Sequence, residues 1–234
     1  MMQTIAYPTP PSDTATLQEQ AYHLVKSRIL NRELKPGQYL NDTQIAEELN
    51  ISRTPVREAF QLLEHEGLLI SEARRGWRVY TLSLEDLHEI FDIKVALEGI
   101  MVRRAAECRD EAKRAALKDA LARMAHAAKT NDYQAWWQAD VDLHAAIADM
   151  CGNERARRVI KNLNEQWQRI RLGFLTMEGR MERAIPEHAA FVDSILAGNA
   201  DDAERQIQSH LNSLRDELVH VLTNMVLPFA QNGI

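Results

Sequence analysis

The sequence SRTPVREAF at residues 52–60 decides the fold of the first part of this chain. Ser52 is a favoured helix N-cap, and the proline of this stretch falls in the first turn, where a missing backbone N–H costs little. Apolar residues then recur with the spacing of one buried helical face, at Val56, Ala59, Phe60 and Leu63. We therefore expect a helix that leaves Arg53, Thr54 and Arg57 on its opposite side.

The residues before this helix predict two more helices. Residues 41–49 have the pattern of a short helix, with Asn41 and Gln44 placed as a capping box, and a two-residue turn separates it from the helix that follows. Further upstream, Thr16 with Glu19 marks the start of a longer amphipathic helix. Together these segments predict a helix followed by a helix-turn-helix.

The residues after the helix predict a β-hairpin. Gly67 is placed to end the helix, and residues 68–70 and 77–80 have the apolar, β-branched and aromatic composition of paired strands. Their connection, residues 71–76, is basic and ends in glycine. This order of elements predicts a winged helix-turn-helix domain over residues 14–80.

A winged helix-turn-helix places the N-terminal turns of its second motif helix in the major groove of DNA. The alternative is a small helical domain whose arginines are only solvated. The complete order of elements favours DNA binding, because the helix-turn-helix and the hairpin each have a separate role in a DNA-binding domain. Although the formal net charge is −6, arginines concentrate at the helix tip and hairpin, at Arg53, Arg57, Arg74, Arg75 and Arg78. A local positive surface on an acidic chain is typical of a selective regulator.

Four segments of this domain resemble the GntR family of bacterial transcription regulators. They are KPG at residues 35–37, IAEEL at 45–49, SRTPVREA at 52–59, and the stretch 62–69. The resemblance implies a homodimer that binds a short palindromic operator, with the recognition helix on bases and the wing glycine in the minor groove.

Carried onto matching positions, the resemblance implies a set of DNA contacts in this chain. Arg53, Thr54 and Arg57 of the recognition helix would contact bases, and Arg75 and Gly76 of the wing would contact the minor groove. Thr43 and Ser52 would contact phosphates. Thr43 departs from relatives that carry a basic residue there, so operator preference is expected to differ more than the mode of binding.

Composition sets the limits of the rest of the chain. Its 234 residues suit one large or two modest domains. We expect no membrane span and no leader peptide, a disordered proline-containing tail at residues 1–13, and a short tail at 229–234. Cys108 and Cys151 have no metal or redox spacing, which favours reduced thiols in the cytoplasm.

After a linker at residues 81–83, residues 84–228 are predicted to be all helical. Ser83 and Asp86 form a capping box for a helix that continues to Cys108. Five more helices are predicted at residues 111–130, 133–151, 154–177, 186–197 and 203–226. Their short connections predict a six-helix antiparallel bundle, so the chain as a whole is expected to be mostly α. No phosphate-binding loop or nucleophile elbow is present in the sequence.

The bundle contains a candidate metal site. Asp140 and His144 are four residues apart and therefore lie on one helical face. His188 and His210 flank the turn at residues 198–199 almost symmetrically, so antiparallel packing brings them to the same height. Three imidazoles and one carboxylate suit Zn²⁺ or a similar divalent ion. An Asp-x-x-x-His pair is common without metal, and the equal heights of the other two histidines are what favour a site.

The helical part resembles the FCD effector-binding domain, in its shorter, VanR-like form. The resemblance rests on residues 140–144, 152–153, 187–188 and 203–210. It implies a divalent metal, most often Zn²⁺ with Ni²⁺ or Mn²⁺ as alternatives, held by one Asp and three His, and a small organic or sugar acid beside it. Relatives place an arginine on the first helix of this domain, where this chain has Lys94, which is either an effector contact or a surface residue. Arg169 and Arg171 are further candidate effector contacts.

The resulting hypothesis is a metabolite-responsive bacterial transcription regulator. It would be a repressor that binds a palindromic operator as a homodimer and is controlled by a carboxylate effector. The chain is not expected to be an enzyme. Two alternatives stay open: a DNA-binding regulator whose metal is purely structural, and a metalloenzyme fused to a DNA-binding domain.

Overall fold

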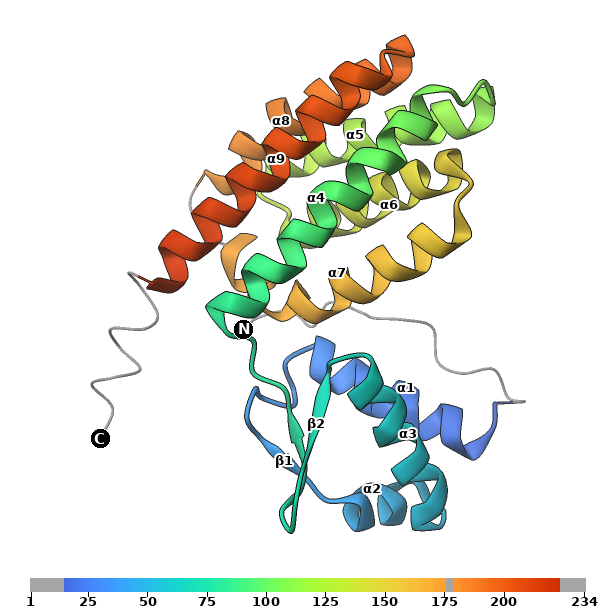
Figure 1. The fold of residues 1–234 in the computed structure, drawn as a ribbon, viewed down its shortest axis with the longest axis vertical. Helices are drawn as coiled ribbons and strands as arrows, with labels where there is room; N and C mark the ends of the chain where they lie inside the picture. Colours follow the sequence, from blue (N-terminus) through green and yellow to red (C-terminus); the bar gives the residue numbers. More distant parts are fainter. Residues whose placement is uncertain (1–14, 176–178, 224–234) are drawn as a thin grey trace. The chain divides into compact units, whose positions relative to one another are not determined.

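The computed structural model describes residues 15–175 and 179–223, and for residues 167–175 it describes the backbone alone (Figure 1). The expected tails at 1–13 and 229–234 lie outside the described residues. The chain divides into two compact units at Leu82 and Ser83, with residues 165–169 grouped with the first. No helix in the described ranges is apolar enough over a sufficient length to cross a membrane.

The first unit contains three helices and a small sheet in its described part. In chain order they are α1 (Leu17–Leu30), β1 (Tyr39–Leu40), α2 (Asp42–Leu49), α3 (Arg53–His65), β2 (Leu69–Glu72) and β3 (Gly76–Val79). The sheet is antiparallel with the order β1-β3-β2. The predicted winged helix-turn-helix is therefore confirmed. Strand β1 was not predicted, because a two-residue strand has no periodicity of its own and is defined by its pairing with β3.

The helix starts of the first unit agree with the sequence, although two of the capping details differ. Thr16 and Glu19 form the predicted capping box at α1. At α2, the Asn41 side chain accepts a hydrogen bond from the backbone N–H of Thr43 at 2.9 Å, so the predicted pairing with Gln44 was wrong. Ser52 is the N-cap residue of α3, but its side chain makes no capping hydrogen bond. The hydroxyl of Ser52 is therefore not used to start the helix.

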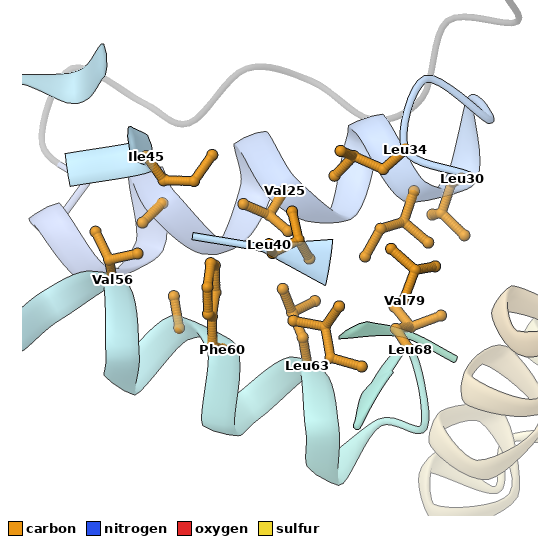
Figure 2. Close-up of a cluster of buried hydrophobic side chains, with 14 of the residues drawn as sticks. Val25, Leu30, Leu34, Leu40, Ile45, Val56, Phe60, Leu63, Leu68 and Val79 are labelled. Carbon is orange, nitrogen blue, oxygen red and sulfur yellow. The ribbon is translucent and has the colours of Figure 1, made fainter. Parts of the chain in front are cut away.

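The core of the first unit is built on the predicted face of α3 (Figure 2). Val56, Ala59, Phe60 and Leu63 are all fully buried. They lie in one cluster with Val25 and Leu30 of α1 and with Val79 of β3. Phe60 also makes an edge-on contact with Trp77, with ring centroids 5.7 Å apart. This packing fixes the wing and α3 on one small body.

The second unit is an all-α bundle, as predicted. Its helices are α4 (Leu84–Ala106), α5 (Glu111–Thr130), α6 (Tyr133–Cys151), α7 (Glu154–Leu175), α8 (Arg180–Ala197) and α9 (Ala200–Val221). The prediction that α8 begins at Pro186 was wrong, because the helix begins at Arg180 and accommodates the proline inside. The prediction that α9 begins at Ala203 was also wrong, since the helix begins at Ala200 and its N-cap is Asn199, a residue of the α8–α9 turn. Helix α4 ends at Ala106 and not at Cys108.

The helices that carry the candidate site pack against one another. Helix α4 packs against α6, α8 and α9, and α8 and α9 pair as a hairpin closed by Gly198, whose φ is +75°. A Cβ at Gly99 would lie 3.2 Å from Gln208 Nε2 and 3.3 Å from Glu204 Oε1, so α4 and α9 approach closely there. The bundle thereby brings α4, α6, α8 and α9 around one interior.

Replacement of Phe60 by alanine is predicted to destabilise the first unit by about 3–5 kcal/mol, because it leaves a cavity in a fully packed core. Hydrogen–deuterium exchange of the amides of α1 and α3 measures this loss. The matched control is Leu62→Ala on the same helix, since Leu62 is 45% exposed and its removal should change stability by less than about 0.5 kcal/mol. Equal effects of the two substitutions would show that the cluster is not the core.

Candidate DNA-binding surface and metal centre

The tip of α3 presents the predicted polar residues to solvent. The side chains of Arg53 and Arg57 are 59% and 64% exposed, and Ser52 and Thr54 are exposed beside them. Thr43, near the start of α2, is half-buried. The buried face of α3 is apolar, so the arginines on its other side are available to an external partner.

The wing carries the other predicted contacts. The hairpin of β2 and β3 ends in exposed Arg75 and Gly76, and Gly76 has a φ of +90°, a backbone conformation that favours glycine. Arg75 Nη1 donates to the Tyr39 hydroxyl oxygen at 3.4 Å. Arg78 instead donates from Nε to Glu72 Oε1 at 2.6 Å. Arg75 is thus the wing arginine that faces the same region as α3.

The wing and the recognition helix share one hollow of about 360 Å³. It is lined by Tyr39, Leu40, Asn41, Asp42, Arg53, Arg57, Arg75, Gly76 and Trp77. Four of the predicted contacts therefore lie together, two from α3 and two from the wing, whereas Thr43, Ser52 and Thr54 are outside the lining. Three guanidinium groups around one concave surface can take anionic groups such as DNA phosphates.

Asp42 is a residue of this hollow that the sequence reasoning missed. Arg53 Nη2 donates to both Asp42 carboxylate oxygens, at 2.9 and 3.0 Å, and Arg57 Nε lies 3.6 Å from Asp42 Oδ2. Burial opposes ionisation of this carboxyl, but Arg53 and then Arg57 outweigh it and hold the pKa of Asp42 below its usual value. The sequence gives no sign that the first residue of α2 faces arginines on the next helix.

The candidate metal centre lies inside the bundle. One potential ligand atom each from Asp140, His144 and His188 lies within 4.8 Å of the other two. Asp140 Oδ1 is 3.2 Å from His188 Nε2 and 3.8 Å from His144 Nε2. Asp140 is fully buried and His188 is 1% exposed. The structure therefore brings together three of the four residues predicted from the sequence as ligands.

His210 lies next to this group. Its ring centroid is 4.4 Å from that of His188, and its side chain is buried. The inference that residues on either side of the α8–α9 turn reach the same height is therefore correct. His210 is nevertheless not among the three residues whose ligand atoms converge within 4.8 Å.

Each imidazole has an acceptor at Nδ1. Nδ1 lies 2.8 Å from the Ala184 carbonyl oxygen in His188, 3.3 Å from Glu98 Oε2 in His144, and 2.8 Å from Glu187 Oε2 in His210. A neutral imidazole that donates its Nδ1 proton keeps a lone pair on Nε2. In His188 and His144 that lone pair then faces the oxygen of Asp140. Acceptors that face one another in a buried space fit a cation between them, and outer acceptors at the second ring nitrogen are typical of metal-bound histidines.

Two carboxylates, buried Glu98 and half-buried Glu187, extend the site, and the sequence reasoning assigned a role to neither. Glu98 accepts from Lys94 Nζ at 2.6 Å, and Lys94 also donates to Asn164. Burial opposes ionisation of Glu98, but Lys94 and His144 outweigh it and hold its pKa well below the usual value. Lys94 is 2% exposed, so the expectation that it could be a surface residue is wrong. Its spacing of four residues from Glu98 was the signal for this pair.

Glu187, on α8, connects a histidine to a cation in the same way as Glu98 does on α4. Its side chain leaves the helix away from His188, as expected for an adjacent residue, and instead binds His210. Buried Arg180 lies on the same helix, with Nη2 3.8 Å from Glu187 and Nε 3.3 Å from Glu217. Each carboxylate thus connects a histidine of the site to a buried cation.

Aromatic rings border the site. Trp136 is buried, with its ring centroid 6.1 Å from that of His188. Its indole N–H has no hydrogen-bond acceptor among the described residues. Buried tryptophans usually place this N–H on an acceptor, so the indole is a donor available to a polar ligand. The side chains of the predicted effector contacts Arg169 and Arg171 lie outside the described residues.

Two family models match this chain. The model of the bacterial regulatory proteins of the gntR family matches residues 17–79, and the FCD domain matches residues 89–213. Similar sequences include the HTH-type transcriptional regulator YdhC of Bacillus subtilis, which is 29% identical over 87% of this chain and 91% of its own length. The HTH-type transcriptional repressor RspR of Escherichia coli is 24% identical over 88% and 90%.

Solved structures show the same fold. Escherichia coli McbR (YncC) has a TM-score of 0.72 at 21% identity, over 88% of this chain and 99% of that one. A transcriptional regulator from Rhodococcus sp. RHA1 has a TM-score of 0.69 at 21% identity, over 87% and 97%. The relatives are transcription regulators and not enzymes.

The buried imidazole of His210 predicts a pH dependence of the metal-free protein. Burial, with His188 acting in the same direction and Glu187 against it, lowers the pKa of His210 from 6.5 to about 4. The unfolded chain therefore binds one proton more than the folded chain between these values, and the stability present above pH 6.5 is lost as the pH falls. The expected loss between pH 7 and pH 5 is about 2 kcal/mol.

Urea unfolding of metal-stripped protein at the two pH values measures this loss. His210→Gln should remove it, while His126→Gln, at an exposed position on α5, should leave it unchanged. An equal pH dependence in all three proteins would mean that His210 is not buried in its neutral form.

Proposed function

The chain belongs to the GntR family of bacterial regulatory proteins and carries an FCD domain, and from this premise we propose a metabolite-responsive repressor that binds a palindromic operator as a homodimer. DNA binding and transcription regulation follow from the family. The palindrome, the direction of control, the metal and the effector are the proposed parts.

The hollow between α3 and the wing supports the proposed DNA contacts. Arg53, Thr54 and Arg57 are assigned to base edges, because a helix tip in the major groove presents these positions. Arg75 and Gly76 are assigned to the minor groove, and Thr43 and Ser52 to phosphates. The exposure of both α3 arginines supports this assignment, since neither is needed in the core.

An exposed apolar stripe on α4 supports the homodimer. Ile93 and Ile100 are 49% and 51% exposed and lie seven residues apart, on one face of the helix. A dimer axis gives two winged helices that match the two halves of a palindrome. Repression is supported by RspR, a relative whose name describes a repressor. We place this activity in the cytoplasm, where the free thiols of Cys108 and Cys151 stay reduced.

The facing acceptor atoms inside the bundle support a divalent metal. Asp140, His144, His188 and His210 would hold it, and one carboxylate with three imidazoles favours Zn²⁺, with Ni²⁺ and Mn²⁺ as alternatives. When bound, the metal supplies a Lewis-acid site for a carboxylate oxygen. Ala184, Glu98 and Glu187 lie at Nδ1 of the three rings and would leave Nε2 of each ring to bind the metal.

A small organic or sugar acid is the proposed effector. The indole N–H of Trp136 has no acceptor among the described residues, and its ring lies beside that of His188, which supports a polar occupant of the site. Lys94 is committed to Glu98 and Asn164, so we assign it to holding Glu98, and through it His144. Direct contact with the effector then falls to Arg169 or Arg171.

Helix α4 is the proposed link between the two functions. It begins directly after the winged helix, at the Ser83 cap, and carries both Lys94 and Glu98. A change at His144 would reach α4 through Glu98, and α4 would shift the spacing of the two winged helices in the dimer. Binding of effector and DNA would then weaken each other by the same factor.

A second candidate function is a DNA-binding regulator whose metal is only structural. Its support is the burial of three of the four proposed ligands, because Asp140, His188 and His210 are at most 4% exposed, whereas the His144 side chain is 20% exposed. A closed site of this kind stabilises the fold without an open position for an effector.

Replacement of Arg57 by alanine is predicted to weaken binding to the preferred duplex by about 1–3 kcal/mol and to relax base preference at one position of each half-site. The preferred duplex is obtained by selection from a random-sequence pool with the wild-type protein, and fluorescence anisotropy gives the affinities. Arg104→Ala, at an exposed arginine of α4, is the control. Full discrimination among single-base variants by the Arg57 variant would remove Arg57 from base recognition.

The metal and the effector are tested by thermal melting of metal-loaded and metal-stripped protein with a panel of organic and sugar acids. A saturable rise in melting temperature that requires metal is expected, and His188→Ala should abolish it along with metal retention. His126→Ala is the matched control because it removes an exposed histidine. Metal-dependent stability without any response to acids would favour the structural metal, and no retained metal would reject both versions.

A further inference from the structure

Asp42 is the one acidic residue among the described residues that line the hollow between α3 and the wing. An acid in the lining of a surface proposed to bind polyanionic DNA opposes binding unless it has another role. Its position is well defined, because it is the first residue of α2 and its side chain is 14% exposed. The helix N-terminus also favours a carboxylate there.

The contacts of Asp42 leave the outer edges of both guanidinium groups open. Arg53 uses only Nη2, which donates to both carboxylate oxygens, and Arg57 turns Nε toward Oδ2 at 3.6 Å. Both Nη atoms of Arg57 are therefore available for a bidentate contact, such as the N7 and O6 acceptors of a guanine. A half-buried carboxylate on one side of an exposed guanidinium restricts the plane in which the other side presents its donors.

We propose that Asp42 is a positioning and specificity-determining residue, which orients Arg53 and Arg57 for base edges and repels phosphates from the same hollow. This inference rests on the proposed DNA contacts of the two arginines. Preorganised arginines lose less conformational entropy when they meet the correct bases. On other sequences, the contacts are mostly to phosphates, and there the Asp42 charge offsets part of the arginine charge.

Asp42 therefore acts in opposite directions on the two kinds of DNA. It strengthens binding to the preferred duplex, in which the guanidinium planes must match base edges. It weakens binding to any other duplex, in which the arginines mainly contact phosphates and the net charge of the hollow sets the affinity. A residue with a merely structural role would affect both kinds of binding in the same direction.

The test compares wild type, Asp42→Asn and Glu47→Gln on the selected duplex and on a scrambled duplex, across a range of salt concentrations. Asn keeps the shape of the side chain and removes its charge. Glu47→Gln removes one negative charge from an exposed position of the same helix and serves as the control. Circular dichroism verifies that all proteins are folded.

For Asp42→Asn, affinity for the selected duplex should fall by about two- to tenfold, the factor for one or two side chains that lose their preorganisation. Affinity for the scrambled duplex should rise by about two- to fivefold. The dependence of log K on log salt for the scrambled duplex should steepen by up to about 0.9, as one more phosphate is neutralised. Glu47→Gln should leave the ratio of the two affinities as in wild type.

Three results would overturn the inference: a loss of affinity for both duplexes, an equal gain for both, or no difference from Glu47→Gln. Arg57→Ala separates this failure from failure of the proposed contacts. If Arg57→Ala weakens binding to the selected duplex and Asp42→Asn behaves as the control, only the role of Asp42 is wrong. If Arg57→Ala also has no effect, the proposed arginine contacts fail, and the role of Asp42 with them.

Discussion

The structure of the helical unit depends on the burial of one carboxylate, that of Asp140, against the Nε2 atoms of His188 and His144. An ionised carboxylate in such a place needs a compensating charge. The polar groups around it can serve this requirement, because the Ala184 carbonyl, Glu98 and Glu187 can each accept a hydrogen bond from Nδ1 and leave the Nε2 lone pair of that ring for a cation. Helices α4, α6, α8 and α9 pack around it, and each contributes a ligand or the partner of a ligand.

Lys94 and Arg180 complete this arrangement on opposite helices. Each is a buried cation that pairs with a carboxylate bound to a histidine of the site, Glu98 on α4 and Glu187 on α8. A buried ion pair is costly unless its hydrogen bonds are satisfied, and loss of one partner leaves an uncompensated charge. The site is therefore connected to the surrounding helices by buried ion pairs. Removal of one partner of such a pair would leave the other charge uncompensated. In the proposed regulator, these connections would carry an effector signal into α4.

The sequence was sufficient for features that depend on local spacing. The apolar period of α3 predicted Val56, Ala59, Phe60 and Leu63 as its buried face, and the symmetry around the α8–α9 turn predicted that His188 and His210 are neighbours. It was not sufficient for contacts between distant segments. Strand β1, the pairing of Asp42 with Arg53, and the link from Glu98 to His144 are set by tertiary packing, which no local pattern encodes. Pro186 misled the prediction because proline usually marks a helix start, whereas here the helix contains it.

X-ray absorption spectroscopy of the purified, metal-loaded protein tests most directly whether this buried cluster holds a cation. If the cluster holds a cation, we predict a first shell of nitrogen and oxygen at about 2.0–2.2 Å, with the outer-shell scattering of several imidazoles. Asp140→Asn should remove oxygen from that shell or abolish metal binding. A sulfur shell at about 2.3 Å, or a metal that dialysis removes without any change in the histidine environment, would contradict the account.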